Sequence, residues 1–309
     1  MNGEKFIEVP ETNTESEIKE FIDSMNRCPK SGLHNPLKNP DRYLLYGEVC
    51  KRLVTAMQEP EVEDFFAKLV QRVVGKSDAQ ARAEVVVTRK MLENFCGDNV
   101  RFLLKSFNVP GDYQGQYSTG YRFPYGSCAL ITPFNFPIEI PVLQMMGAVF
   151  CGNKLVFKGD PRVSIVMDQF LRLMDHCGAP PTDIDFINSG GQVMERVLLG
   201  ANIKMTQFTG SSKVAHHLVD KLKGKVRIED AGFDWKILGP DVREFDYVAW
   251  QCDQDAYAAS GQKCSAQSIL FAHEKWVKAG LIQKLKDLAA RRKLDDGTIG
   301  PVLTWNNEQ

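Results

Sequence analysis

The sequence lacks any apolar run long enough to cross a bilayer. Its longest stretch without a charged residue, Phe123–Ile138, has 16 residues and contains three prolines, whereas a membrane helix needs about 20 apolar residues. Met1–Phe6 shows neither the basic and apolar segments of a secretory signal nor the Arg- and Ser-rich character of a transit peptide. The sequence therefore predicts no membrane span, and it shows no targeting segment.

Cysteine is too sparse and too scattered to form a disulfide scaffold. The 309 residues include eight cysteines, and no two of them form a C-x-x-C pair. Such a distribution argues against a zinc ribbon and against a thioredoxin-type motif. The sequence predicts free thiols in a reducing compartment and no metal site.

A strong charge of either sign is also missing. Lys and Arg number 38 and Asp and Glu number 39, which leaves a formal net charge of -1. Nucleic acids and anionic membranes attract proteins with a positive field. This balance therefore argues against either as the main partner, and the chain's length suits about two soluble domains.

Two phosphate-binding fingerprints are absent, G-x-G-x-x-G and G-x-x-x-x-G-K-S/T. The sequence contains instead three apolar stretches at helical spacing, Tyr43–Met57, Val62–Val74 and Ala79–Phe107. A Gly-, Tyr- and Gln-rich stretch follows at Val109–Gly120 and predicts an exposed strand pair with a turn. We expect the three helical stretches to cover another layer.

Beyond this point short apolar strands alternate with helical segments, a pattern typical of βαβ units and a parallel sheet. Ligands of such sheets bind beyond the carboxyl ends of the strands. The predicted strands are Cys128–Thr132, Lys154–Phe157, Asp185–Ile187, Met205–Phe208, Val226–Ile228 and Lys236–Leu238.

Two segments after predicted strands could bind anionic groups. In Ile131–Pro137, two prolines stiffen a loop around Asn135, whose amide could donate to an oxyanion; a local Asx turn explains the same pattern. Gly210 and Ser211 lie at a strand-to-helix turn where free amides could hold a phosphate. A plain helix N-cap explains this second segment equally well.

Two further residues could take part in covalent chemistry. Cys264 lies between Lys263 and Ser265 in a Gly-containing junction, where exposure and positive charge would favour the thiolate; a buried small hydrophobe is the common alternative. Glu229 lies near a strand end and could act as a general base. Solvation or pairing with a nearby cation is the usual state of such a carboxylate.

The order and spacing of five segments resemble the aldehyde dehydrogenase superfamily. The match extends over nearly the whole chain and is most similar to its plant-type delta-1-pyrroline-5-carboxylate dehydrogenase branch, marked by Arg89–Asp98, Glu229–Lys236 and Trp250–Asp255. The five segments are Ile131–Pro137, Asn153–Gly159, Phe208–Ser212, Glu229–Gly232 and Gly261–Ser265.

The resemblance implies oxidation of L-glutamate 5-semialdehyde, the open form of 1-pyrroline-5-carboxylate, to L-glutamate with NAD in proline catabolism. Cys264 would be the nucleophile that forms a thiohemiacetal and then a thioester. Asn135 would stabilise the oxyanion, and Glu229 would activate the water that hydrolyses the thioester. Lys263 and Ser265 would face the carboxylate end of the substrate.

The resemblance also implies a cofactor site. Lys158 would contact the adenosine ribose, the carbonyl of Phe134 would face the cofactor, and Gly210 with Ser211 would meet the pyrophosphate. The acid usual three residues after the ribose lysine is replaced by Pro161, which leaves open the choice between NAD and NADP. Met194 stands where the family commonly has a glycine near the adenine.

The family implies an α/β fold, with a Rossmann-type doubly wound parallel sheet, N-terminal helices and only the start of a catalytic domain. The later E-x-F-G-P motif does not occur, so we expect a chain truncated at both ends. The expected divisions are an N-terminal helical part (1–108), an oligomerisation-type hairpin (109–126), the NAD-binding domain (127–258) and the start of the catalytic domain (259–309). A homo-oligomer in the mitochondrial matrix is expected for the full-length protein. The alternatives are an inactive fragment and an aldehyde dehydrogenase of other specificity.

Overall fold

The computed structural model describes residues 7–33 and 41–303. A five-stranded parallel sheet forms the centre, with strand order β5-β4-β3-β6-β7. This arrangement confirms the parallel sheet predicted from the alternating pattern. Its strands are β3 (Ser127–Ile131), β4 (Lys154–Lys158), β5 (Ile184–Phe186), β6 (Met205–Gly210) and β7 (Val226–Asp230).

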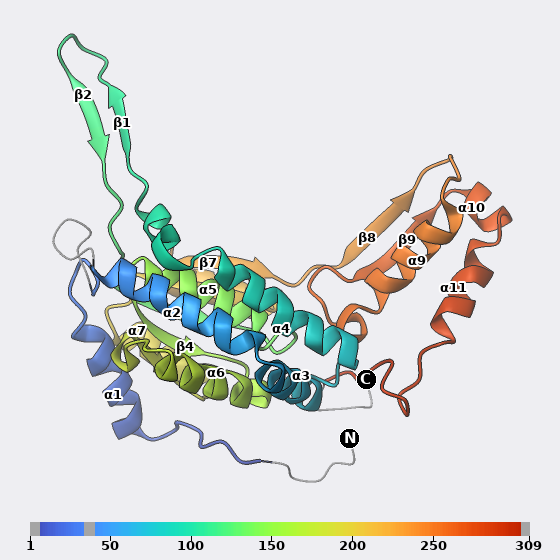
Figure 1. The fold of residues 1–309 in the computed structure, drawn as a ribbon, viewed down its shortest axis with the longest axis horizontal. Coiled ribbons are helices and arrows are strands. Elements are labelled where there is room, and N and C mark those ends of the chain that lie inside the picture. The colour runs from blue at the N-terminus through green and yellow to red at the C-terminus, as the bar shows by residue number, and fades with distance from the viewer. Residues whose placement is uncertain (1–6, 34–40, 304–309) are drawn as a thin grey trace.

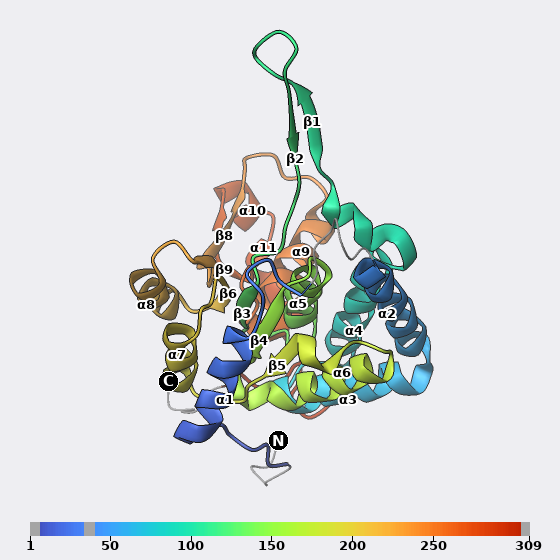
Figure 2. The ribbon, with the colours of Figure 1, turned by 90° about the vertical axis from the view of Figure 1, so that its left-hand side faces the viewer.

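Helices cover both faces of this sheet (Figure 2). Because side chains alternate along a strand, Leu130 and Phe157 enter one core while Ala129 and Val156 enter the other. The first core contains side chains of α2 (Asp41–Gln58), α3 (Pro60–Val74), α4 (Asp78–Glu93), α5 (Glu139–Phe150) and α6 (Ser164–His176). The second contains side chains of α1 (Glu15–Asn26), α7 (Gly191–Gly200) and α8 (Ser212–Leu222).

The first two helical stretches form α2 and α3 as predicted, but the third is shorter than expected. Within the predicted stretch Ala79–Phe107, α4 ends at Glu93 and a 3-10 helix, η1, spans Gly97–Leu104. Gly97 has a φ of +60°, a backbone conformation that glycine adopts easily and that interrupts an α-helix. Its carbonyl also lies directly against Gly47 of α2. The chain therefore turns here to pack on α2.

A two-stranded antiparallel hairpin projects from the body of the molecule (Figure 1). It consists of β1 (Phe107–Pro110) and β2 (Tyr117–Gly120), within and just before the stretch predicted to form a strand pair. Phe107, Tyr113 and Tyr117 are all exposed on it. Its use in oligomerisation stays a prediction.

A second unit follows the central sheet, with β8 (Asp234–Leu238) paired in parallel with β9 (Gln267–Ala272). The sequence pattern placed Lys236–Leu238 in the series of βαβ strands, but the strand belongs to this separate sheet. Its partner lies beyond residue 258, so the expected division at 258/259 separates two paired strands and stays a prediction. The unit also contains α9 (Phe245–Ala256), α10 (Glu274–Lys278) and α11 (Leu281–Ala289).

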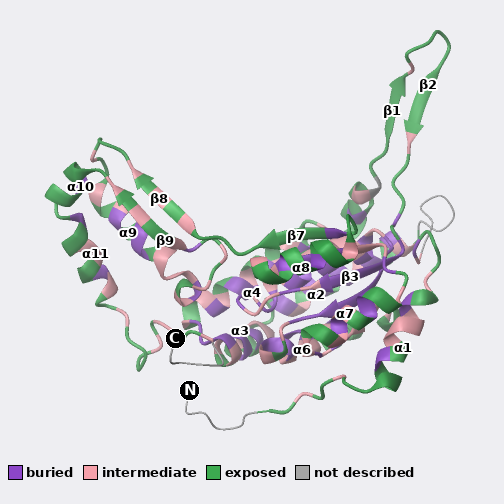
Figure 3. Cartoon of the chain, turned by 180° about the vertical axis from the view of Figure 1, so that it is seen from behind, coloured by how far each residue is buried: buried purple, intermediate pink, exposed green. Residues whose placement is uncertain are grey.

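The burial pattern separates the well-covered centre from two exposed elements. The central strands are mostly buried, whereas the hairpin and much of the β8–β9 sheet are exposed or half-buried (Figure 3). Three short 3-10 helices complete the described structure: η2 (Pro161–Val163), η3 (Pro181–Asp183) and η4 (Ala258–Gly261). The expectations on Met1–Phe6 and on the last residues up to Gln309 lie outside the described residues.

Candidate functional site

A cavity of about 920 Å³ lies at the carboxyl ends of the central strands. Strand β3 is followed in sequence by β4 on one side, whereas β6 lies on its other side. The connections therefore diverge between β3 and β6, the usual ligand position in a doubly wound sheet. Five segments line the cavity there: Ile131–Asn135, Lys158 with Asp160, Phe208–Ser211, Asp230–Gly232 and Gly261–Cys264.

Asn135 connects the loop after β3 to the cysteine segment. Its side chain is 6% exposed, and its Nδ2 donates to the carbonyl of Gln262 over 2.8 Å. The partner is 127 residues away, so this contact is not the local Asx turn that the sequence left open. The Oδ1 of Asn135 is buried without a hydrogen-bond partner among the described residues.

Cys264 follows a strained stretch of backbone. Ala259 and Ser260 have φ values of 49° and 59°, and Gly261 has 80°. For residues with a Cβ this conformation costs of order 1–3 kcal/mol and persists only where surrounding contacts hold it. Those contacts are hydrogen bonds from the Ser260 hydroxyl to the Gly300 carbonyl (2.8 Å) and from the Leu303 amide to the side chain of Gln262 (2.8 Å).

This strained stretch presents Cys264 to the cavity. Its side chain is half-buried, and both it and Lys263 line the cavity. Ser265 is exposed but is not among the residues that line the cavity. The buried-hydrophobe alternative therefore does not describe Cys264.

The other seven cysteines have environments that disfavour the thiolate. Burial raises the pKa of each of these thiols, and that of Cys128 reaches about 12. Cys50, Cys128, Cys177 and Cys252 are buried, and the rest are half-buried. Cys264 differs from all of them because it faces the large cavity.

Lys158 brings a positive charge to the end of β4. Its side chain is buried, and its Nζ donates to the Gly159 carbonyl at 3.0 Å, its one hydrogen bond among the described residues. Burial lowers the pKa of Lys158, because the buried ammonium group has little contact with water. A ligand that accepts hydrogen bonds would improve its environment.

Arg162 contacts two other residues that line the cavity, Asp160 and Phe134. Its guanidinium donates to Asp160 from Nη2 (2.7 Å) and Nε (2.9 Å) and lies 4.5 Å from the ring centroid of Phe134. Burial alone would raise the pKa of Asp160, but the hydrogen bonds and charge of Arg162 outweigh it and leave that pKa below its ordinary value. Asp160 is therefore a carboxylate already engaged by a cation.

The β6–α8 turn can receive an anion. Ser211 is the N-cap of α8, yet its side chain makes no capping hydrogen bond, so the simple capping role left open by the sequence is not seen. Ser211, Lys213 and Val214 at the start of this helix line the cavity, where the helix dipole favours negative charge. A Cβ at Gly210 would lie 2.6 Å from the ring of Phe208, which makes glycine the residue that fits this turn.

The far end of the cavity lies between α7 and α8. The Nε2 of His217 and the Oε2 of Glu195 are 2.7 Å apart and link the two helices. Met194 is buried in the second core, so the residue that departs from the family's glycine serves packing. Both Met194 and the His217–Glu195 pair line the cavity.

Glu229 does not line the same cavity as Cys264. It lies on β7 and lines a second cavity of about 620 Å³, together with Leu143 and Gln144 of α5. Its neighbour Asp230 lines the first cavity, as expected because successive side chains of a strand point to opposite faces. The catalytic role predicted for Glu229 stays a prediction.

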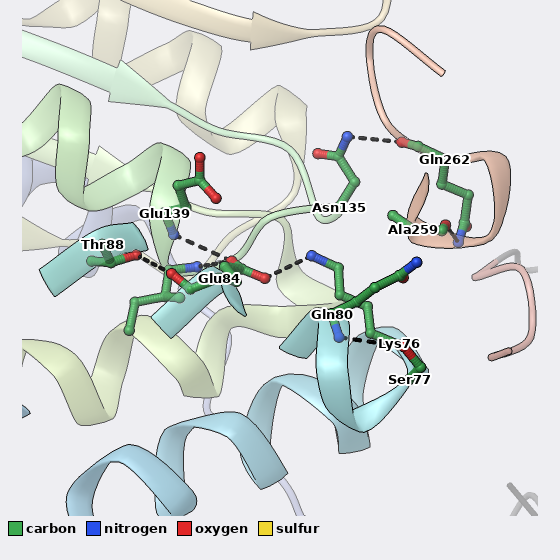
Figure 4. A network of polar contacts seen from close by, with 10 residues as sticks. Lys76, Ser77, Gln80, Glu84, Thr88, Asn135, Glu139, Ala259 and Gln262 are labelled. Atoms are coloured by element: carbon green, nitrogen blue, oxygen red, sulfur yellow. Dashed lines mark hydrogen bonds and ion pairs between the residues drawn. The ribbon is translucent and has the colours of Figure 1, made fainter. Parts of the chain in front are cut away.

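Lys76 and Glu84 were not anticipated from the sequence. Both are buried, they form an ion pair, and Glu84 binds the first amides of α5 beside Asn135 (Figure 4). One signal was available: Glu84 lies on the apolar face of α4, among Ala81, Val85 and Thr88. A charged residue at such a position needs a specific partner.

Two further properties of the described residues bear on function. No cluster of three or more metal-ligating side chains occurs in residues 7–33 and 41–303. Within the same ranges, no helix combines the length and the apolarity required to cross a membrane.

Comparison with known proteins gives a family match over residues 3–309, to the model described as "Aldehyde dehydrogenase family". The chain is 61% identical to Delta-1-pyrroline-5-carboxylate dehydrogenase 12A1, mitochondrial, from Arabidopsis thaliana, over 100% of this chain and 55% of that protein. It is 60% identical to a probable aldehyde dehydrogenase from Linum usitatissimum, over 100% of this chain and 56% of that protein. The chain thus spans about half the length of these curated relatives.

Solved structures share the fold at low identity. An E. coli NADP-dependent enzyme superposes with a TM-score of 0.84 at 22% identity, covering 97% of this chain and 62% of the other. A bifunctional proline utilization A protein superposes with a TM-score of 0.82 at 20% identity, covering 98% of this chain and 31% of the other. These matches confirm the predicted fold class, and the family match confirms the resemblance stated from the sequence.

Proposed function

The chain belongs to the aldehyde dehydrogenase family, and we propose that its site oxidises L-glutamate 5-semialdehyde to L-glutamate with NAD. One observation carries the proposal: Asn135 and the Cys264 segment meet across a cavity that also contains Lys158 and the N-terminus of α8. The substrate is proposed from the similarity to the Arabidopsis protein. Because the chain spans about half of such relatives, the activity is proposed for a protein that contains this site.

Cys264 would begin the reaction as a nucleophile. Its thiolate Sγ attacks the aldehyde carbon, a C–S bond forms, and the carbonyl electron pair moves to oxygen. The amide of Asn135 has two N–H groups, of which one binds the Gln262 carbonyl. The second is free to donate to the new oxyanion, with the backbone N–H of Cys264 as the other donor.

The residues of the first cavity fit a dinucleotide. The uncapped amides of α8 at Ser211 suit the pyrophosphate, and the buried Lys158 suits ribose hydroxyls. The carbonyl of Phe134 would face the cofactor from the loop after β3. When bound, NAD would supply the acceptor for the hydride that leaves the reacting carbon. Asp160 and Arg162 bind each other, so neither side chain by itself decides between NAD and NADP.

Glu229 would act on the thioester from the second cavity, on the face of β7 opposite to Asp230. It lines the second cavity, from which it would take a proton from water as that water attacks the thioester carbon, after which the C–S bond breaks and the Cys264 thiolate leaves. Gln144 lines this cavity and donates at 2.7 Å to Thr209, which lines the first. This hydrogen bond links a residue of each cavity; the cofactor would bind in the first cavity and the hydrolytic water in the second.

Lys263 and Ser265 would bind the charged end of the substrate. Both flank the nucleophile and are exposed. A lysine ammonium and a hydroxyl are suitable donors to a carboxylate. A mitochondrial location and a homo-oligomer are proposed on the same basis, because the Arabidopsis relative is named as mitochondrial and the aromatic hairpin is exposed.

The proposal is tested by NADH formation in a chimaera that joins this chain to the remaining part of the Arabidopsis relative. We expect turnover with L-glutamate 5-semialdehyde, weaker turnover with unsubstituted aldehydes of the same length, and none in the Cys264→Ala variant. Nucleotide binding should survive in that variant. Equal turnover with substituted and unsubstituted aldehydes would refute the proposed substrate.

A further inference from the structure

An ion pair is buried in the helical layer next to the candidate site. Lys76 Nζ lies 2.6 Å from Glu84 Oε2, and the two side chains are 1% and 0% exposed. Burial lowers the pKa of Lys76 although Glu84 opposes the change. Removing two charges from water costs several kcal/mol per ion. The pair therefore needs a reason beyond mutual attraction.

The other carboxylate oxygen of Glu84 supplies such a reason. Its Oε1 accepts from the amides of Ile138 (3.0 Å) and Glu139 (3.2 Å). These amides begin α5, whose N-cap residue Ile138 has no side chain able to cap the helix. A carboxylate at a helix N-terminus satisfies these donors and complements the helix dipole. Glu84 is thus a cap supplied from a helix 54 residues away.

Lys76 contacts the loop that leads from Asn135 to α5. Its ammonium lies 3.6 Å from the ring centroid of Phe136, the residue after Asn135, which is a favourable cation–π geometry. Gln80, in the first turn of α4, donates at 3.3 Å to the carbonyl of Tyr257 in the segment leading to Cys264. Lys76 and the first turn of α4 thus contact both segments that meet at the site. Figure 4 shows Lys76, Gln80 and Glu84 near Asn135 and Gln262.

We infer that Lys76 and Glu84 are positioning residues that hold the amide of Asn135 against the Cys264 segment. The inference rests on the proposed function, in which Asn135 donates to the oxyanion. Neither residue lines the cavity, so both act through the loop between Asn135 and Ile138.

Hydrogen exchange of the Asn135 side-chain amide tests this inference without any chemistry. Isotope-labelled asparagine makes the amide visible by NMR, and loss of its signal in Asn135→Ser assigns it. Glu84→Gln removes the charge that caps α5, and we expect exchange at Asn135 to quicken by about tenfold, as for loss of a charged hydrogen bond.

Asp183→Asn is the matched control. Asp183 is another buried carboxylate, bound by Arg42 and Tyr46, and it does not line the cavity. We expect exchange at Asn135 to stay unchanged in this variant. Equal acceleration in both variants, or none in Glu84→Gln, would overturn the inference.

A double variant provides a second test in case Glu84→Gln alone does not fold. Lys76→Met combined with Glu84→Gln replaces the ion pair by uncharged groups of similar size, a change that is often neutral for stability. Faster exchange at Asn135 is again expected, because neither the charged cap nor the cation on Phe136 remains. Wild-type exchange in this folded variant would contradict the inference.

A second measurement tests whether Glu84 acts through Asn135 when an aldehyde adds to Cys264. A carbonyl-labelled aldehyde should add reversibly to Cys264, forming a C–S bond, with the oxygen then taking a proton from water. Asn135→Ala and Glu84→Gln should each weaken the adduct about tenfold. Together they should weaken it no more than Asn135→Ala alone, because coupled residues give non-additive effects.

The two measurements separate the two claims. If the wild-type chain forms no adduct at Cys264, the proposed function loses support, while the exchange data still decide whether Glu84 positions Asn135. If the adduct forms and the two substitutions act additively, Glu84 does not work through Asn135 and the inference is refuted.

Discussion

Cys264 should be the first of the eight cysteines to react with a limiting amount of an alkylating reagent. The thiolate is the reactive form, and burial raises the pKa of each of the other seven thiols. Cys128, with its pKa raised to about 12, is ionised in roughly one molecule in 10,000 at about pH 8.

Solvent access leaves three other thiols that could compete with Cys264 for the reagent. Cys28, Cys96 and Cys151 are half-buried like Cys264, and the remaining four are buried. Each rise of one pKa unit lowers the thiolate fraction about tenfold at a pH below the pKa. We therefore expect Cys264 to carry most of the label, because it faces the cavity while burial disfavours the thiolate of each half-buried competitor.

The assay is peptide mapping after brief treatment with less than one equivalent of iodoacetamide. Cys264→Ser should remove the fast-reacting fraction, whereas the matched control Cys96→Ser should keep it. Labelling of Cys96 or Cys252 ahead of Cys264 would refute the reasoning, because it would show that the cavity-facing thiol is not the accessible one.

Four further outcomes are expected. Lys158→Met should weaken NAD binding about tenfold or more, the usual cost of a lost charged hydrogen bond, as measured by calorimetry. Glu229→Gln in the active chimaera should keep the initial burst of NADH while turnover falls about 10²–10⁴-fold. Burial and a neighbouring carboxylate raise the pKa of Glu139, so its charged form is destabilising above that pKa. Glu139→Gln should raise the melting temperature at about pH 7, and the gain should vanish at about pH 4, where the native carboxyl is protonated. Trp235→Lys should reduce self-association in light scattering, because it interrupts an exposed apolar strip.

Each of these outcomes has a control or a contrary result. Lys154→Met, on the same strand as Lys158 but bound to Asp185, should leave NAD binding unchanged. Loss of the burst in Glu229→Gln would place this residue in the first chemical step. A stability gain in Glu139→Gln that persists at low pH would mean that charge is not its cause. Trp276→Lys, in the core of the second unit, should aggravate association instead of reducing it.

The exposed apolar strip on β8 and β9 shows how far strand prediction from the sequence extends. Trp235 pairs with Ile269 and Ile237 with Phe271, and all four side chains are exposed. The apolar pattern predicted the strand Lys236–Leu238 correctly, because a short apolar run is a local property of the sequence. It could not say that Lys236–Leu238 leaves the central sheet, since strand pairing depends on contacts that local sequence does not encode.

The candidate site was predictable to the extent that its residues follow strands. Lys158, Ser211 and the Asn135 loop converge on one cavity because parallel strands bring their carboxyl ends to one edge. The orientation of Glu229 depends on one residue of register, since Asp230 faces the first cavity instead. Sequence spacing alone could not fix that register.

The buried pair of Lys76 and Glu84 shows why a costly feature can persist outside the cavity. Replacing it with apolar side chains would avoid the desolvation of two ions. It would also leave the buried amide of Ile138 and the half-buried amide of Glu139 without an acceptor, at about 1–3 kcal/mol for each unsatisfied group. The loop between Asn135 and α5 would then lose its anchor. The N-terminal helical layer is for this reason part of the site's architecture, because it supplies the carboxylate that anchors the loop of Asn135.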